Sequence, residues 1–195
     1  MGTKTRNLDY LVNNNINVHN YKEIDNINDL IELSNIYNKF SIRFDNKDII
    51  HNLPFYIYDK DIIENKEEYF NNIINEMNRL NCTLLCSDGY SYDNDLLFNF
   101  VIEIKDDFSF ILELCDKKIP LRDIYKYKTT IIKGNILDKK YEYINRLENK
   151  YSLDNIEYLL DWIISLDKKF KYLEGTLYNK KLGIYNDNIV IWQTN

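Results

Sequence analysis

The sequence predicts an α+β protein with a mostly antiparallel sheet and helices packed on one face of that sheet. Two observations favour this class. Several short runs alternate apolar and polar residues, as half-buried strands do, and longer runs repeat apolar residues at helical spacing. These runs follow one another without the strict strand–helix–strand order of a parallel sheet. The 195 residues contain no repeat or linker, so we expect a single domain, either undivided or built as two small lobes at about 1–80 and 81–195.

The clearest pair of strands lies in residues 97–115. Strand side chains alternate between two faces with period two. A short loop at 105–107 therefore places the large apolar side chains of the even positions side by side, as one wall of a core. These residues are Phe98, Phe100, Ile102, Ile104, Phe108, Phe110, Leu112 and Leu114.

Shorter patterns define the elements before this hairpin. Asn26 precedes apolar residues at helical spacing and can cap that helix. Phe40, Ile42 and Phe44 alternate with polar residues and predict a strand. In chain order we expect a short helix near 8–12, an extended piece over 17–24, a helix over 27–37, strands at 40–44 and 55–58, a helix over 61–80, a strand at 83–86 and a polar loop at 87–95. The loop is rich in Asp, Asn and Gly, and as a turn it needs no metal.

The elements after the hairpin follow from the same rules. Ser152 can cap a helix whose apolar residues recur at helical spacing. In chain order we expect a helical turn after Pro120, a strand at 129–132, helices over about 138–149 and 153–169, and two closing strands at 172–178 and 188–192.

Composition and charge exclude several classes of function. No run approaches the roughly 18 apolar residues of a membrane span, and no apolar signal segment follows Met1, so we expect a cytoplasmic protein that binds no membrane. The formal net charge of −6 argues against direct binding of nucleic acid, because phosphate contacts need Lys and Arg. The three cysteines and two histidines lack the spacing of a zinc site, so we expect no metal ligand among them.

Charge is distributed unevenly along the chain. Residues 1–115 contain 10 Lys and Arg against 20 Asp and Glu, whereas residues 116–195 contain 15 against 11. The acidic part can face a basic partner, and the basic part can hold a phosphate-bearing ligand. The basic side chains concerned are Arg122, Lys126, Lys128 and Lys133. Solvated faces of a soluble protein are the simpler explanation.

The polar face of the hairpin is the first candidate for a ligand site. In the expected register Glu103 pairs with Ser109 and Asn99 with Glu113, so that two carboxylates project from one surface. Arg43, on the polar side of a neighbouring strand, can join them. This surface is either a wall for a small ligand or a solvated face on which Arg43 forms an ordinary ion pair.

The order of the elements carries a resemblance to a known family. The segments concerned are a helix with Leu8 and Leu11, Ile16-Asn17-Val18, an extended piece to Ile24, a helix over 28–38, Ser41-Ile42-Arg43, the strand at Thr83, the hairpin, Leu121-Arg122, and Leu173-Glu174-Gly175 before Gly183 and Asn186. This order resembles ATP-grasp proteins and the related phosphoenolpyruvate-synthase-type nucleotide-binding domains. It implies an ATP-grasp-like layout and ATP with Mg²⁺ as the ligand.

The resemblance also assigns roles to particular residues. A strand ending in Lys or Arg meets the nucleotide phosphates in those families, which implies that Arg43 faces phosphates. Glu174 and Asn186 then stand where metal-binding carboxylate and amide groups lie. A glycine-rich loop and the Glu-x-Asn ending of the family are absent from this sequence. The resemblance therefore implies a reduced or degenerate relative that binds a nucleotide without turning it over.

The sequence thus leads to two functional hypotheses. The first is a non-catalytic or weakly catalytic protein that binds a nucleotide or another phosphorylated small molecule through Arg43, Arg122 and the polar sheet face. The alternative is an acidic inhibitor from a phage or mobile element that binds a basic surface of a host protein, such as a defence nuclease. The bias toward Asn, Ile and Tyr reflects AT-rich codon usage, which is common in such elements. A subunit of a larger assembly that uses its tyrosines as interface anchors is a third option.

Overall fold

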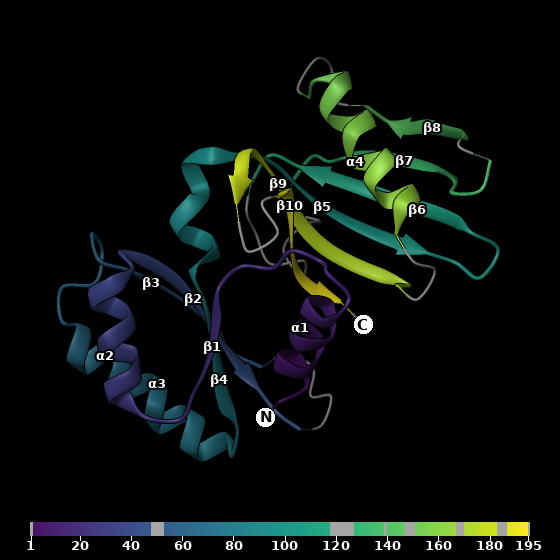
Figure 1. Ribbon diagram of the computed structural model, residues 1–195. Coiled ribbons are helices and arrows are strands. Elements are labelled where there is room, and N and C mark those ends of the chain that lie inside the picture. Colours follow the sequence, from purple (N-terminus) through teal and green to yellow (C-terminus); the bar gives the residue numbers. More distant parts are fainter. Residues whose placement is uncertain are drawn as a thin grey trace. The chain divides into compact units, whose positions relative to one another are not determined.

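The computed structural model describes residues 2–47, 53–117, 127–138, 140–146, 151–166, 170–182 and 187–194 (Figure 1). The chain forms two compact units. Unit 1 contains residues 1–14 and 19–93, and unit 2 contains residues 15–18 and 94–195. Each unit has its own antiparallel sheet, so the predicted α+β class with mostly antiparallel pairing is confirmed.

Unit 1 is built around a four-stranded sheet with the order β1-β4-β2-β3. Its elements are α1 (Thr3–Asn13), β1 (Tyr21–Ile24), α2 (Ile27–Ile36), β2 (Lys39–Asp45), β3 (Phe55–Asp59), α3 (Lys66–Leu80) and β4 (Thr83–Ser87). Asparagine side chains cap two of these helices: that of Asn26 accepts from the N–H of Asp29 in α2, as predicted, and that of Asn65 accepts from the N–H of Glu68 in α3. Because Asn65 is the cap, α3 begins later than the predicted residue 61.

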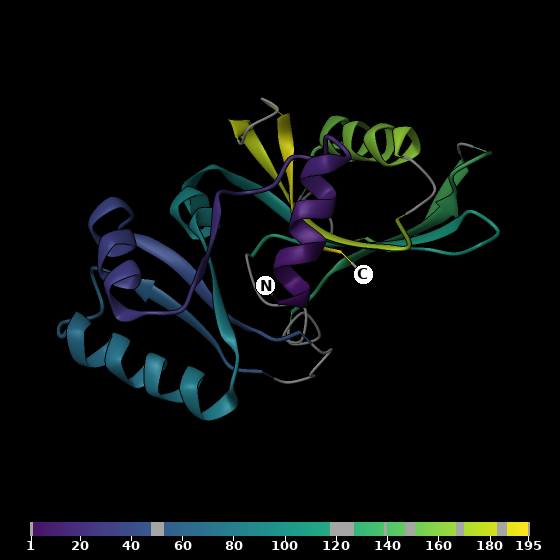
Figure 2. The same cartoon turned by 60° about the horizontal axis from the view of Figure 1, so that its bottom comes forward.

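Both faces of the sheet in unit 1 carry helices. α2 and α3 lie together on one side (Figures 1 and 2), over a core that includes Phe40, Ile42 and Phe44, as their alternation predicted. α1 lies against the other face, since Thr5 hydrogen-bonds to Asp45, whose side chain alternates with that of Phe44.

A half-buried tyrosine, Tyr69, makes the stability of unit 1 depend on pH in the alkaline range. Tyr69 donates to the carbonyl of Ile57 at 3.1 Å, and burial, followed by the nearby Tyr56, raises the pKa of Tyr69 from 10.0 to about 12. The folded state therefore keeps this proton to higher pH than the unfolded state does. The stabilisation is complete below about pH 10 and falls as pH rises toward about 12.

We expect the urea midpoint of unfolding to decrease between about pH 10 and about pH 12, with a shallower decrease in Tyr69→Phe. Tyr69→Phe lacks the hydrogen bond to Ile57, so its stability is lower at all pH values. Because it also lacks the ionisable group, its stability depends less on pH. Equal slopes for the two proteins would contradict the assignment.

Unit 2 is built around a six-stranded sheet with the order β10-β9-β5-β6-β7-β8. Its strands are β5 (Leu96–Ile104), β6 (Ser109–Cys115), β7 (Thr130–Asn135), β8 (Lys140–Asn145), β9 (Tyr172–Leu182) and β10 (Asp187–Thr194). The helix α4 (Leu153–Ser165) packs on one face of this sheet (Figure 2). There the rings of Trp162 and Phe100 meet edge to face, with their centroids 6.2 Å apart. The predicted polar loop at 87–95 contains the 3₁₀ segment η1 (Asp88–Asp95), of which residues 88–93 belong to unit 1.

The register of the β5–β6 hairpin differs from the predicted one. Glu103 pairs with Ile111, and Asn99 pairs with Cys115, instead of Ser109 and Glu113 respectively. The turn is longer than expected, because Phe108 adopts φ 63° and hydrogen-bonds within the turn. A shift of two residues keeps the side chains of both strands on their predicted faces, so the division into an apolar and a polar face holds. Phe108, predicted as part of the apolar wall, instead lies half-buried in the turn before β6.

The predicted helix over 138–149 is wrong, because residues 140–145 form β8 and pair with β7. Tyr141 and Tyr143 alternate with Glu142 at the period of two that is typical of a strand, and aromatic residues are common in strands. The next helix, α4, begins at the predicted residue 153 but ends at Ser165. The predicted turn after Pro120 lies outside the described residues, as do residues 167–169. Of the helices that the structure describes, none has the length and apolar character needed to cross a membrane.

Candidate functional site

Four of the residues predicted to bind a ligand share one face of the sheet in unit 2. Asn99 and Glu103 lie on β5, Glu113 on β6 and Glu174 on β9. Strand pairing places Val101 of β5 beside both Glu113 and Glu174, and directly paired residues share a face. This polar face is the one opposite Phe100 and α4.

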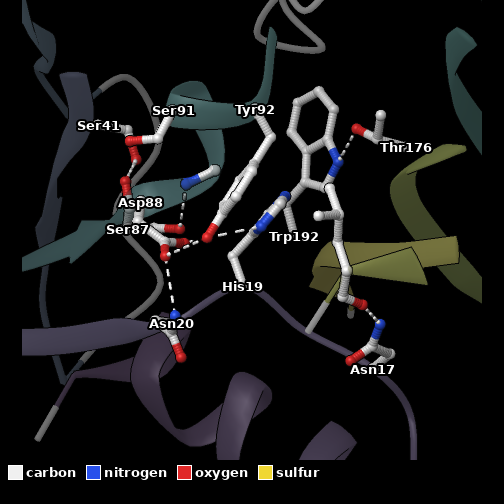
Figure 3. A network of polar contacts seen from close by, with 12 residues as sticks. Asn17, His19, Asn20, Ser41, Ser87, Asp88, Ser91, Tyr92, Thr176 and Trp192 are labelled. Carbon is white, nitrogen blue, oxygen red and sulfur yellow. Dashed lines mark hydrogen bonds and ion pairs between the residues drawn. The ribbon is translucent and has the colours of Figure 1, made fainter. Parts of the chain in front are cut away.

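Around β9, the polar face is buried and bonded within unit 2. The Asn99 side chain donates to the carbonyl of Lys117 and accepts from the Thr176 hydroxyl at 2.8 Å. The indole N–H of Trp192 donates to the same hydroxyl at 2.8 Å (Figure 3). Because Asn99 and Thr176 are both buried, this chain of bonds holds β5, β9 and β10 together.

The carboxylates of this face differ in their surroundings. Glu174 is buried and accepts from the Tyr172 hydroxyl at 2.6 Å, and Glu113 is half-buried and accepts from the Thr129 hydroxyl at 2.6 Å. Glu103 is exposed. Their roles toward a ligand stay predictions, and of the three Glu103 is the one most open to a ligand.

Three further residues were predicted to bind a ligand: Arg43, Arg122 and Asn186. Arg43 belongs to β2 in unit 1, where its guanidinium lies over the ring of Phe55 at 5.6 Å, so it is not part of the polar face of unit 2. Arg122 and Asn186 lie outside the described residues.

A groove of about 500 Å³ lies over β6, β7 and β8. It is lined by Lys105, Ser109, Phe110, Ile111, Lys133, Gly134, Asn135, Lys140, Tyr141 and Glu142. Strand pairing aligns Ile111 with Lys133 and Glu142, and Ser109 with Asn135 and Lys140. These six residues therefore belong to the polar face, and the groove opens at the end of that face away from β9 and β10.

The charges around the groove are mainly positive. Among the lining residues that the structure describes, three are lysines, Lys105, Lys133 and Lys140, and one is a carboxylate, Glu142. An oxygen of Glu142 lies 2.7 Å from the Lys133 ammonium. The side chain of Ile111 is 40% exposed and offers an apolar surface between them. Lysine stems add further apolar contact area while their ammonium groups stay in water. This arrangement suits an anion that also carries an apolar part.

The pKa values of two side chains near the groove, Tyr141 and Asp107, are shifted by their surroundings. Burial, and next the negative charge of Glu157 on α4, raise the pKa of Tyr141, so its phenol stays neutral and can donate a hydrogen bond. In the adjacent turn the hydroxyl and the N–H of Ser109 both donate to Asp107, which lowers the pKa of that carboxyl.

The sequence revealed only part of this groove. Lys133 is one of the basic residues that the sequence predicts to bind phosphate, but the sequence predicts no such role for Lys105 and Lys140. Lys140 was missed because residues 138–149 were predicted as a helix, which separates it from Lys133. The alternation of Tyr141, Glu142 and Tyr143 is the signal that could have placed it on a strand.

In the residues that the structure describes, no three His, Cys, Asp or Glu side chains are grouped as metal ligands are. No family model matches the chain, and a search of curated proteins returns no match.

Solved structures similar to this chain include two ligases and a macrocyclase. The ATP-grasp ligase PsnB complexed with minimal precursor is 9% identical, with a TM-score of 0.44 over 99% of this chain and 50% of that one. The macrocyclase MdnC from Microcystis aeruginosa MRC, bound with precursor peptide MdnA, is 8% identical, with a TM-score of 0.49 over 99% and 52%. A RiPP-associated ATP-grasp ligase from Chryseobacterium gregarium, in complex with ADP and a leader and core peptide, is 8% identical, with a TM-score of 0.47 over 99% and 51%.

The chain thus spans about half the length of these structures.

Proposed function

We propose that the protein binds an anionic small molecule, a nucleotide or another phosphorylated compound, in the groove over β6, β7 and β8. The observation that carries the proposal is the groove of about 500 Å³, a volume within the roughly 300–1,000 Å³ of small-molecule sites. Lys105, Lys133 and Lys140 supply ammonium groups for phosphate oxygens. Ile111 supplies apolar surface for the rest of the ligand.

The proposed role is binding without catalysis. The groove fits phosphate groups better than it fits a metal ion, because Glu142 is the one carboxylate among the described residues that line it and is already paired with Lys133. We therefore assign no Mg²⁺ ligand in the groove. ATP with Mg²⁺, which the sequence resemblance implies, remains one member of the ligand class.

Titration with nucleotides tests the proposal. We expect ATP, GTP or a cyclic nucleotide to raise the melting temperature, with and without Mg²⁺. Replacing both Lys133 and Lys140 by Gln should weaken binding about tenfold or more, which corresponds to a loss of about 1.4 kcal/mol. Isothermal titration calorimetry measures the change.

The control for this variant is Lys171→Gln with Lys180→Gln. These two lysines are also in unit 2 and pair with Asp106 and Asp95 outside the groove. The control should bind as the wild type does. No binding by any member of the panel, or equal affinities of the two double variants, would exclude the groove as the site.

A second candidate is the binding of an extended peptide along β8. This strand ends the order of the six-stranded sheet, and an edge strand offers backbone groups to which a peptide can add as a further strand. Acidic side chains of such a peptide would meet Lys140 on the polar face. Including a Val-Glu-Val-Glu-Val-Glu peptide in the calorimetry, beside its Val-Lys counterpart, distinguishes this candidate from a nucleotide.

The inhibitor hypothesis remains an alternative, since it depends on the acidic residues 1–115 and not on the groove. Capture of a basic protein from a lysate that is lost at high salt would favour it. The Lys133→Gln, Lys140→Gln variant would leave such capture unchanged, because that variant alters unit 2 only in the groove.

A further inference from the structure

Unit 1 contains a small cavity that the proposed function does not use. It has a volume of about 80 Å³ and lies at the ends of β1 and β4, beside the last turn of α2. Leu33, Phe40 and Tyr37 form apolar and aromatic walls, while Asn20 and Asp88 are polar members of its lining. At about 30 Å³ for each water-sized group, it has room for two or three such groups.

A buried carboxylate borders this cavity. The side chain of Asp88 is 1% exposed, and polar groups hold it from several sides (Figure 3). The Asn20 side chain donates to Asp88 Oδ2 at 2.8 Å, and the Tyr92 hydroxyl donates to the same oxygen at 3.4 Å. Asp88 Oδ1 lies 3.7 Å from Nδ1 of His19.

The position of the carboxylate is set by residues packed behind it. The rings of His19 and Tyr92 are stacked, with centroids 5.8 Å apart and an interplanar angle of 7°. The backbone N–H of Asp88 donates to the carbonyl of Asn20 at 3.2 Å. These contacts all lie within unit 1 and keep Asp88 at the cavity wall without filling the cavity.

The electrostatics of the cavity are negative. Burial, and next the charge of Asp88, raise the pKa of both Tyr37 and Tyr92, as expected where a negative potential opposes ionisation of a phenol. Lys22 also lines the cavity, but its ammonium lies 2.7 Å from Asp29 and 3.8 Å from Glu32. The two carboxylates of α2 thus outweigh the one cation at the rim.

We propose that this cavity binds a small organic cation, an alkylammonium or alkylguanidinium head group, with its charge facing Asp88. A buried carboxylate supplies the complementary charge. The rings of Tyr37 and Phe40 in the wall are surfaces that favour cations over neutral groups of the same shape. The volume admits the head group, and the rest of the ligand extends toward the rim. The same chemistry belongs to a free amine and to the Arg or Lys side chain of a partner.

A pair of ligands of equal shape tests the proposal on the unaltered protein. N-Ethylguanidinium carries a positive charge, and N-ethylurea does not. We expect the amide resonances of Asn20, Tyr37 and Ser87 to shift on titration with N-ethylguanidinium in ¹H–¹⁵N spectra. N-Ethylurea should bind at least about tenfold more weakly. Equal binding of the two compounds, or no shift at these residues, would overturn the proposal.

Substitutions test whether the carboxylate of Asp88 is the group that binds the cation. Asp88→Asn should weaken binding of N-ethylguanidinium about tenfold or more, whereas Asp61→Asn, which removes an exposed carboxylate of unit 1, should not. If Asp88→Asn does not fold, the comparison of the two ligands on the wild type still decides the question. The Lys133→Gln, Lys140→Gln variant should bind N-ethylguanidinium normally, so failure of one site is distinguishable from failure of the other.

A capped Gly-Arg-Gly peptide identifies the source of the cation. Tighter binding of the peptide than of N-ethylguanidinium, with shifts at the same amides, assigns the cavity to an arginine side chain of a partner. Weaker binding assigns it to a free small molecule.

Discussion

Replacing Phe100 by alanine will lower the free energy of unfolding by about 3–5 kcal/mol. Phe100 is 1% exposed and contacts Trp162 of α4 edge to face. Its ring also fills the space over Gly175, where a Cβ atom would lie 2.6 Å from Phe100 Cζ. The variant therefore leaves a cavity between α4 and the sheet.

Urea unfolding followed by tryptophan fluorescence measures this loss. The two tryptophans of the chain, Trp162 and Trp192, both belong to unit 2, so the signal reports the unit that carries Phe100. Ile144→Ala is the matched control, because Ile144 is 56% exposed on β8, and its loss should change stability by less than about 0.5 kcal/mol. Similar losses in the two variants would contradict the packing described for α4.

Replacing Asp45 by alanine will destabilise unit 1 by about 2–4 kcal/mol. Asp45 is buried and accepts from the N–H groups of Lys4 and Thr5, both at 2.9 Å, and from the Thr5 hydroxyl at 2.8 Å. Gly2, the N-cap of α1, provides no side-chain bond. Asp45 of β2 therefore caps α1, and alanine leaves those N–H groups without their acceptor.

Amide hydrogen exchange measures the destabilisation of α1 residue by residue. The amides of α1 should lose protection more than those of α3, which Asp45 does not contact. Asp45→Asn keeps one acceptor oxygen but loses the charge that favours a helix N-terminus, so its effect should be intermediate. Unchanged protection of α1 in Asp45→Ala would show that the helix is held by other contacts.

Glycine is needed beside this cap. A Cβ atom at Gly2 would lie 2.1 Å from the Asp45 carboxyl carbon, so the close approach of α1 to β2 depends on a residue without a side chain. The sequence contains no local signal of this contact, because the two residues are 43 positions apart and belong to different elements.

Local patterns predicted most of the fold. The alternation at Phe40, Ile42 and Phe44 and the asparagine before Ile27 each depend on neighbouring residues, and the structure confirms both. The prediction failed at β8, because a short exposed edge strand lacks the strong apolar alternation of β5 and β6. The hairpin register was also missed, because it depends on the conformation of Phe108, a non-glycine residue with positive φ.

The candidate site was less predictable than the fold. Period-two alternation was enough to place Asn99, Glu103 and Glu113 on one face. It could not show that Asn99 is bonded to Lys117 and Thr176, or Glu113 to Thr129, since those partners lie 16 to 77 positions away in the sequence.

The amino-acid order alone established the α+β class, the two faces of the hairpin and the uneven charge, because each of these follows from residue type and short-range periodicity. Strand order, and with it the meeting of Lys105, Lys133 and Lys140 over three neighbouring strands, became known only from the folded chain. The burial of Asp88 beside His19 likewise joins residues 69 positions apart. Such contacts arise from the packing of residues far apart in the sequence, so short-range periodicity cannot predict them.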